Sequence, residues 1–243
     1  MRLIVVSPPK LGRGKADTWS PQEAMTFLDT AMNRPVLHRG GDSGIRRPDD
    51  LAPIWHLLLL EGLRRGEGLG LRWRDVNFER GTAHIVQTVA PDKSNRGKAI
   101  IQDRTKTLAG ARSVRLTERT LVALKEHRTV QLQRRLAAPA WQDNDLIVCT
   151  ATGRPVNPNN VSRSFDAIVK AAGLRRIRVH DLRHTSATML LLAGTPAKIV
   201  SERLGHASVG ITLDLYSHVL PDMQADAATA MDGVFDRAKA VSS

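Results

Sequence analysis

The chain has 243 residues, and its 36 Lys and Arg outweigh 24 Asp and Glu to give a formal net charge of +12. This charge favours a polyanionic partner, with nucleic acid as the first expectation. The single cysteine, Cys149, excludes an intrachain disulfide. The apolar runs Leu3–Val6 and Leu57–Leu60 are too short for a signal peptide or a membrane span, so we expect a cytoplasmic protein with no membrane contact.

The N-terminal part predicts a basic linker followed by two helices. Residues 1–19 hold Pro8-Pro9, Lys10 and alternating Gly and basic residues, which is typical of an extended linker or tail. Ser20-Pro21-Gln22-Glu23 is a helix start with Ser as the N-cap. After an expected loop over residues 33–47, Asp50 is a candidate cap for a second helix. Its inward positions are Leu51, Ile54, Leu58 and Leu59.

The middle of the chain predicts three short strands and then two longer helices. The strands are expected at 82–89, 99–106 and 112–116, where β-branched residues recur. Thr117 is expected to cap a helix that runs to about Leu136, with Leu121, Leu124 and Leu132 inward. A second helix is expected over 157–172, ended by Gly173. A basic cluster of Arg175, Arg176 and Arg178 then leads into His180, and we assign these three arginines to DNA binding.

The stretch from His180 to His218 carries the chemistry. His180 and Arg183 are three residues apart and share one face of a helix. Arg183 offers a planar fork of donors that fits phosphate oxygens. His206 follows Gly205, an expected helix stop. Tyr216 is the only tyrosine, so the stretch indicates phosphoryl transfer to a tyrosine oxygen.

The order His-x-x-Arg, Leu-Gly-His and Thr-x-x-x-Tyr-Ser-His resembles the C-terminal signature of tyrosine recombinases, the phage integrase family. The resemblance extends over the chain from about residue 20. It implies a catalytic domain that is mainly α with a small antiparallel β-sheet, the DNA breaking-rejoining fold. The implied division is a tail or linker at 1–19, a catalytic domain at 20–220 and a C-terminal helix within 221–243. In that family a small helical DNA-clamping domain usually precedes such a linker.

The same resemblance assigns further residues. Glu61-Gly62-Leu63-Arg64 resembles the first signature box, which makes Arg64 the first catalytic arginine and Glu67 its acidic support, with Arg65 a neighbouring DNA contact. Gly68 and Gly70 depart from the family pattern, and their low helix propensity suggests a mobile segment. Lys106 matches the lysine of the mobile β-hairpin, with Lys93 and Lys98 as rivals. His184 and His218 are expected as supporting neighbours of the site.

These roles imply DNA cleavage through a 3′-phosphotyrosyl intermediate. Arg64 and Arg183 meet the charge that develops on the phosphate. His180 takes the proton of Tyr216, directly or through another group, and His206 donates to a non-bridging oxygen. Lys106 protonates the leaving 5′-oxygen. No cofactor and no metal is expected, because arginines supply the positive charge and the spacing of His180 and His184 lacks the glutamate of a zinc-binding helix.

Two alternatives stay open from the residues. One is a helix-turn-helix protein that binds DNA without chemistry, since 196–219 reads as helix, glycine turn and helix. The other is an enzyme like type IB topoisomerases. For a recombinase, the expected partners are double-stranded DNA with specific sites, an accessory DNA-bending protein and three further copies of the chain. The chain would be a monomer when free and a homotetramer on DNA, with the helix after Tyr216 docking on a neighbouring subunit.

Overall fold

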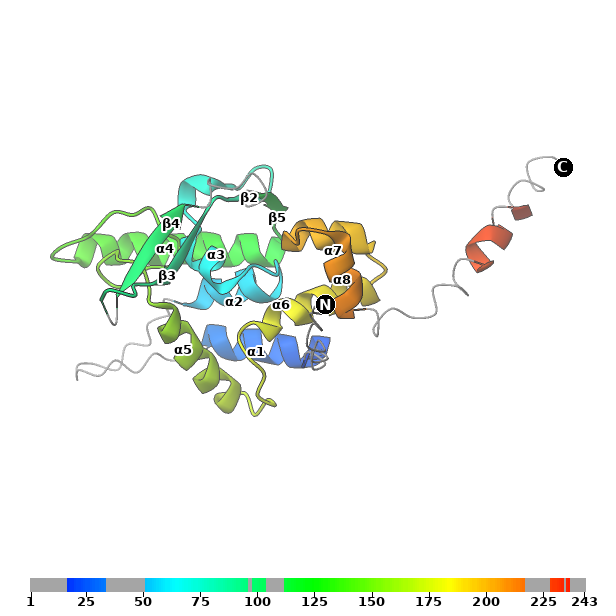
Figure 1. Cartoon of the computed structure of the whole chain (residues 1–243). Coiled ribbons are helices and arrows are strands. Elements are labelled where there is room, and N and C mark those ends of the chain that lie inside the picture. The colour runs from blue at the N-terminus through cyan, green and yellow to red at the C-terminus, as the bar shows by residue number, and fades with distance from the viewer. Residues whose placement is uncertain are drawn as a thin grey trace, which may run out of the picture.

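The computed structural model describes residues 17–33, 51–95, 98–103, 112–216, 228–233 and 235–236. In this part the chain is mostly helical, with two small antiparallel sheets at one side (Figure 1). The elements in chain order are α1 (Pro21–Asn33), α2 (Ala52–Leu59), α3 (Arg65–Gly70), the 3-10 turn η1 (Trp73–Asp75), β1 (Val76–Asn77), β2 (Thr82–Ile85), β3 (Gln87–Pro91), β4 (Ala99–Asp103), β5 (Arg112–Arg115), α4 (Glu118–Ala137), α5 (Pro158–Ala171), α6 (Asp181–Leu192), α7 (Ala197–Leu204) and α8 (Val209–Tyr216). The predicted fold class is confirmed.

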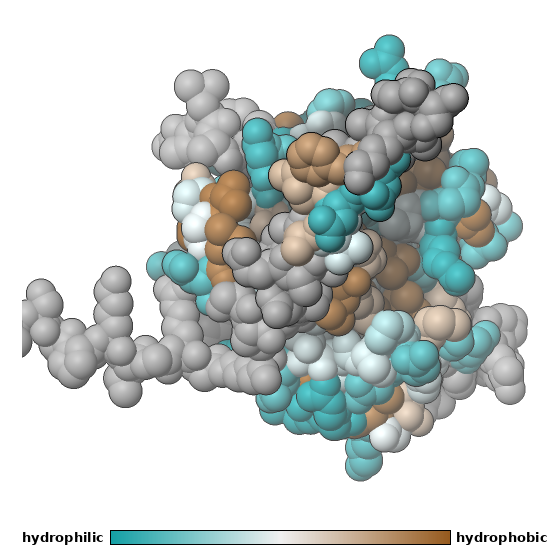
Figure 2. Space-filling model, turned by 90° about the vertical axis from the view of Figure 1, so that its right-hand side faces the viewer, coloured by the Kyte–Doolittle hydropathy of each residue, from teal (hydrophilic) through white to brown (hydrophobic). Residues whose placement is uncertain are grey.

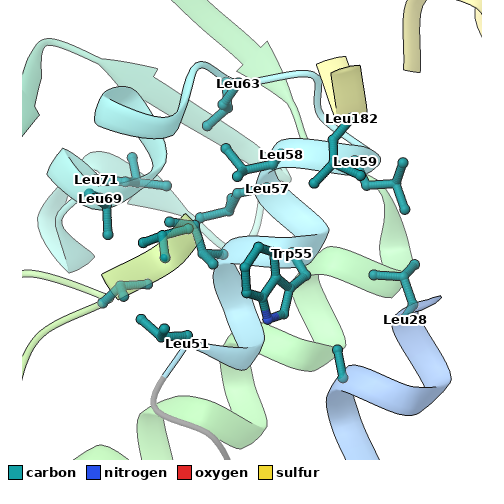
Figure 3. Close-up of a cluster of buried hydrophobic side chains, with 14 of the residues drawn as sticks. Leu28, Leu51, Trp55, Leu57, Leu58, Leu59, Leu63, Leu69, Leu71 and Leu182 are labelled. Carbon is teal, nitrogen blue, oxygen red and sulfur yellow. The ribbon is translucent and has the colours of Figure 1, made fainter. Parts of the chain in front are cut away.

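Helix α2 is the centre of the hydrophobic core. All eight of its residues are buried, rather than one face as the sequence predicts, because α1, α3, α4 and α6 all pack against it. Figure 3 shows Trp55 and the leucines of α2 among leucines from α1, the α3 region and α6. Each fully buried leucine contributes roughly 1.5–3 kcal/mol, so this helix fixes the frame on which the site is built. Its N-cap is Leu51, and Asp50 lies outside the described residues.

Four of the nine aromatic residues of the chain gather in one place. Trp19, Phe27, Trp55 and Phe165 form a cluster with ring centroids 5.0–6.0 Å apart. The cluster joins α1, α2 and α5, elements that are far apart in the sequence. Offset and edge-on ring contacts add stability beyond the area that they bury.

The strands form two sheets where the sequence predicts one. Residues 82–89, predicted as a single strand, divide at Val86 into β2 and β3. Strand β2 pairs with β1 and β5, whereas β3 pairs with β4, and all pairings are antiparallel. As a result, the sheet that contains β2 contacts α7 through its strand β5, whereas β3 packs against α3.

The glycines of α3 serve close packing, which the sequence does not reveal. A Cβ atom on Gly66 would lie 2.9 Å from the carbonyl oxygen of Val89, and one on Gly70 would lie 2.8 Å from that of Gln87. Both distances are shorter than side chains tolerate, so only glycine lets α3 lie directly against β3. The glycine-rich segment predicted to be mobile is therefore packed against a strand, with Gly68 and Gly70 buried.

The caps of the longer helices follow the sequence. Ser20 and Glu23 form the predicted reciprocal capping box at α1. Thr117 caps α4 and Asn157 caps α5. Leu132 was predicted to face inward and is 53% exposed, because the second half of α4 extends beyond the helices that cover its first half.

Helices α6, α7 and α8 enclose a second, smaller core. It consists of Ala187, Leu191, Val200, Leu204 and Tyr216. Gly205, with φ +67°, ends α7 in the left-handed conformation, as predicted for a glycine stop. The predicted helix, glycine turn and helix are therefore present as far as Tyr216. No helix in the described ranges is both long enough and apolar enough to span a membrane.

Candidate active site

Two arginines from distant parts of the chain converge on the C-terminal end of α7. Arg183 in α6 is 3% exposed, and its Nη1 and Nη2 donate to the carbonyl oxygens of Gly62 at 2.7 Å and Leu204 at 2.5 Å. Arg64, directly before α3, donates from Nη2 to the carbonyl oxygen of Gly205 at 3.2 Å. Burial and the nearby charge of Arg64 lower the pKa of Arg183 to about 9, so Arg183 is still a cation at neutral pH.

The turn before Arg64 requires glycine. Gly62 has φ +65°, and a Cβ atom there would lie 2.7 Å from Leu204 Cδ2. Any other residue would be strained at this φ, and its Cβ atom would have to displace the buried side chain of Leu204. The turn and α7 are also tied by an ion pair between Arg203 and Glu61, a fully buried carboxylate that further accepts three hydrogen bonds from Thr117 and Thr120.

Glu67 supports the arginines from behind, at a position that is 1% exposed. Its Oε2 accepts the backbone N–H of Arg64 at 2.9 Å, and its Oε1 accepts Nη1 of Arg64 at 2.8 Å. Burial raises the pKa of the Glu67 carboxyl, but the hydrogen bonds and charge of Arg112 and the hydrogen bonds of Arg64 outweigh burial and bring the pKa down to about 2. Glu67 is therefore an anion at neutral pH and offsets part of the repulsion between the cations around it.

Arg112 in β5 is a member of this network that the sequence analysis missed. Its Nη2 and Nη1 donate to the two carboxylate oxygens of Glu67 at 2.9 and 3.2 Å, and its Nε donates to the carbonyl oxygen of Arg203 at 2.9 Å. Nothing in its local sequence distinguishes it from Arg115, the other arginine of the strand. Only the pairing of β5 with β2, and the contact of β5 with α7, bring it to Glu67.

His206 lies directly after the left-handed Gly205. Its Nδ1 forms a 2.8 Å hydrogen bond with Oγ1 of Thr212, which leaves Nε2 as the ring atom for a substrate oxygen. Burial and the charges of Arg183 and Arg64 lower the pKa of His206 to about 4. The ring is therefore neutral at pH 7 and can donate one hydrogen bond without adding charge.

Tyr216, the last residue of α8, is closed inside the small core and is 2% exposed. Its hydroxyl forms a 2.7 Å hydrogen bond with Nδ1 of His184. Burial raises the pKa of the phenol to about 12, although the charge of Arg183 acts in the opposite direction. In this arrangement the phenol is protonated and shielded from solvent.

His180, the N-cap of α6, and His184 in its first turn lie side by side. The rings of His180 and His184 are 5.1 Å apart and meet edge to face. Sequence reasoning assigned the proton of Tyr216 to His180, directly or indirectly, but His184 is the histidine that contacts the phenol. Burial lowers the pKa of both rings, with Arg183 adding to the effect on His180 and His180 adding to the effect on His184. Both are thus poised to be neutral near pH 7.

The arginines assigned to DNA binding each have a polar partner. Arg65 donates to Oγ of Ser162 at 2.7 Å, and Arg178 pairs with Asp181 at 2.8 Å. Arg175 pairs with Glu23 and Arg176 with Asp166, both at 3.1 Å. Arg65, Arg176 and Arg178 line a hollow of about 440 Å³ that reaches His180. Asp166 and Asp181 offset part of the charge of Arg176 and Arg178, and the hollow adjoins the site directly.

Two assigned residues, Lys106 and His218, lie outside the described residues, so the structure does not place them. Within the described ranges, no three His, Cys, Asp or Glu side chains come together in a group that could hold a metal ion.

Known proteins resemble this chain over most of its length. The model of the phage integrase family matches residues 48–223. A "Tyrosine recombinase XerC-like" protein of Caldanaerobacter subterraneus subsp. tengcongensis is 33% identical over 194 residues, which are 76% of this chain and 50% of the relative. The "ICEBs1 integrase" of Bacillus subtilis is 26% identical over 225 residues, 91% of this chain and 56% of the relative. The chain thus spans about half the length of these curated relatives.

Solved structures share the fold. The Tn1549 transposon integrase, in complex with a circular intermediate DNA, matches with a TM-score of 0.70 at 19% identity, covering 92% of this chain and 68% of that one. XerA recombinase matches with a TM-score of 0.61 at 23% identity, covering 93% and 66%. The family match and the relative at 33% identity together show that the chain belongs to the phage integrase family.

Proposed function

We propose that this chain is the catalytic part of a site-specific DNA recombinase, which cleaves and rejoins DNA through a 3′-phosphotyrosyl intermediate. One observation carries the proposal. Arg64, Arg183 and Tyr216, from three separate parts of the sequence, gather around the C-terminal end of α7 and its Leu204. A helix-turn-helix protein without chemistry has no need of this gathering. The relatives are recombinases and integrases, which favours this reading over both alternatives.

In the proposed reaction, the oxygen of Tyr216 attacks the scissile phosphorus, and the bond from phosphorus to the 5′-oxygen breaks. Arg64 and Arg183 stabilise the charge on the non-bridging oxygens, with a hydrogen bond from Nε2 of His206. The tyrosine proton passes to His184, its hydrogen-bond partner, with His180 next to it. We keep Lys106 as the general acid for the leaving oxygen. The phosphotyrosine retains the bond energy, so rejoining reverses these steps without ATP.

The buried position of Tyr216 implies a movement before cleavage. An enclosed phenol with a pKa near 12 is a poor nucleophile, and DNA cannot reach it in this arrangement. α8 must therefore shift so that the hydroxyl becomes accessible to DNA. In this arrangement the small core and one hydrogen bond keep the Tyr216 hydroxyl in an inactive position.

Double-stranded DNA is the proposed substrate, acted on in the cytoplasm. The net charge of +12 and the arginine-lined hollow beside His180 support it. Phosphate contacts should dominate, so log affinity should fall steeply with log salt, by about 0.9 for each phosphate neutralised. A salt dependence near zero would contradict this.

For assembly we propose a homotetramer on DNA, in which the segment after Tyr216 docks on a neighbouring copy. Leu192, Ile199 and Leu213, one from each of α6, α7 and α8, are exposed. Figure 2 faces this side of the molecule and shows apolar patches between polar ones. Met231 and Phe235 in the C-terminal segment are 59% and 61% exposed and supply complementary apolar side chains. Deleting the residues after Leu220 should abolish assembly and strand exchange but leave the melting temperature of the monomer unchanged; a lower melting temperature with assembly intact would contradict docking between copies.

The central experiment incubates the chain with a nicked suicide duplex that carries candidate sites, followed by a denaturing gel. The expected product is an SDS-stable protein–DNA adduct with a free 5′-hydroxyl. The Tyr216→Phe variant should bind the duplex and form no adduct. An adduct with this variant would contradict the proposal, and strand exchange between two duplexes would separate a recombinase from a topoisomerase.

A second arm of the experiment removes metal ions. Because two guanidinium groups supply the positive charge at the phosphate, cleavage in EDTA should match cleavage in magnesium. Loss of the adduct in EDTA would point to a metal-dependent nuclease.

A further inference from the structure

Three successive carbonyl oxygens at the end of α7 each accept a hydrogen bond from a different arginine. Arg203 accepts from Arg112 Nε at 2.9 Å, Leu204 from Arg183 Nη2 at 2.5 Å, and Gly205 from Arg64 Nη2 at 3.2 Å. The last carbonyls of a helix have no partner within the helix and carry partial negative charge. The carbonyl groups at the end of α7 therefore bind three arginine side chains. Only Arg64 and Arg183 have an assigned role.

The third guanidinium, that of Arg112, is enclosed within the protein. Its side chain is 11% exposed, and Nη1, Nη2 and Nε are all engaged by Glu67 and by the carbonyl of Arg203. The contact with the end of α7 is tight, since a Cβ atom on Gly205 would lie 3.0 Å from Cδ of Arg112. Arg112 therefore touches the groups that hold Arg64 and is itself closed to a phosphate.

We propose that Arg112 is a positioning residue. It shares both carboxylate oxygens of Glu67 with Arg64, so that the Arg64 guanidinium stays available to the phosphate. The inference rests on the proposed function. Glu67 Oε1 serves both Arg64 Nη1 and Arg112 Nη1, while Oε2 serves the backbone of Arg64 and Arg112 Nη2. Without Arg112, both oxygens become open to Arg64, and a guanidinium favours two parallel bonds to a carboxylate over one. Arg64 would then turn toward Glu67 and leave Gly205 and the phosphate.

The same residue sets the place of α7 against β5. The bond from Nε of Arg112 fixes the carbonyl of Arg203, one residue before the carbonyl that holds Arg183. A displacement of this helix end would move Leu204 and Gly205 together, and with them the anchors of both phosphate-binding arginines. Shifts of about 1 Å in such anchors cost about 10²-fold in rate.

The test measures single-turnover cleavage of the nicked duplex at saturating protein, for wild type, Arg112→Gln and Arg112→Lys. We expect the cleavage rate of Arg112→Gln to fall by about 10²-fold, with DNA affinity and the fraction of cleavable protein unchanged. Arg112→Lys keeps the charge but loses the paired bonds, so its rate should lie in between. We also compare Glu67→Gln, Arg112→Gln and the double variant. The cleavage rate of the double variant should be no lower than that of the slower single variant, because both substitutions break the same contact between Glu67 and Arg112.

A matched control is Arg72→Gln. Arg72 donates from Nε and Nη2 to both oxygens of Asp75, at 2.6 and 2.9 Å, and is similarly covered, but it lies outside the arginine network. Its cleavage rate should equal that of wild type. If Arg112→Gln only lowers the melting temperature and the cleavable fraction, while the remaining protein cleaves at the wild-type rate, Arg112 is merely structural and the inference is wrong.

A titration with inorganic sulfate separates this inference from the proposed function, because it needs no cleavage. Sulfate binding to the arginine pair can be followed by the Nε–H resonances of Arg64 and Arg183 in ¹⁵N NMR spectra. We expect Arg112→Gln to weaken sulfate binding several-fold and to shift the Arg64 resonance even without sulfate. If wild type makes no adduct, the proposed function fails and the sulfate result alone decides the inference; unchanged sulfate binding and an unchanged Arg64 resonance would overturn it.

Discussion

The arginines and the tyrosine of the candidate site are held in opposite ways. Arg64 and Arg183 are fixed by the buried carboxylate of Glu67 and by carbonyls at the end of α7, next to the main core. Tyr216 is held by four small or aliphatic side chains and one hydrogen bond to His184. Charges that stabilise a transition state act best when fixed in advance, whereas a nucleophile that attacks DNA must leave its pocket. With the roles proposed above, this contrast predicts a rigid phosphate site and a movable nucleophile.

The strongest test of the rigid half is the buried carboxylate of Glu61. Glu61→Gln would leave the Arg203 guanidinium, whose side chain is 18% exposed, without its counter-charge. We expect the free energy of unfolding to fall by about 3–5 kcal/mol, as for other broken buried pairs. Urea denaturation measures it. Asp166→Asn, which breaks the exposed pair with Arg176, should cost less than about 1 kcal/mol, and equal losses for both variants would refute this account.

The second prediction concerns the chemical role of the rigid half. Arg183→Lys keeps a positive charge but cannot hold two carbonyls and a phosphate at once. We expect the single-turnover cleavage rate to fall by about 10²–10³-fold while DNA affinity changes little. Arg72→Lys, at a paired arginine away from the site, is the control and should cleave normally. A rate for Arg183→Lys within a few fold of wild type would show that the fork is dispensable.

The third prediction uses the low pKa of Glu67. Its carboxyl has a pKa of about 2 in the folded protein and about 4.3 in an unfolded chain. The folded state therefore gains stability at pH values above the unfolded pKa, on the order of 3 kcal/mol, and loses it as pH falls from about 4.5 toward 2. Urea denaturation at several pH values should give wild type a larger free energy of unfolding than Glu67→Gln at pH 7. This difference should decrease as the pH falls. A gap independent of pH would count against an ionised Glu67.

The smallest effect is expected in the tyrosine half. Tyr216→Phe keeps the ring in its pocket and removes only the hydroxyl that bonds to His184. The free energy of unfolding should change by about 1 kcal/mol, although cleavage is abolished. Thermal denaturation and the adduct gel measure the two effects on the same sample. A loss of several kcal/mol would mean that the phenol is a structural anchor, and the contrast between the two halves would fail.

Local patterns predicted much of this protein because they act over a few residues. The caps at Ser20 and Thr117 and the glycine stop at Gly205 depend on backbone groups within one turn. The signature residues Arg64, Arg183, His206 and Tyr216 could be singled out because their order and spacing in the chain resemble a known family. The family itself is shown by comparison with known proteins, while the roles of these residues stay proposals.

What the sequence by itself determined was thus the fold class and several helix ends, and it suggested the kind of chemistry proposed here. Tertiary structure alone decided that β2 and β3 separate at Val86, that Gly66 and Gly70 of α3 pack against β3, and that His184 rather than His180 meets the phenol. It also decided that Arg112, in a strand, shares Glu67 with Arg64. Each of these depends on contacts between elements distant in the chain. Such contacts leave no periodic or local trace in the sequence, because they arise only when β5, α3 and α7 meet around the core.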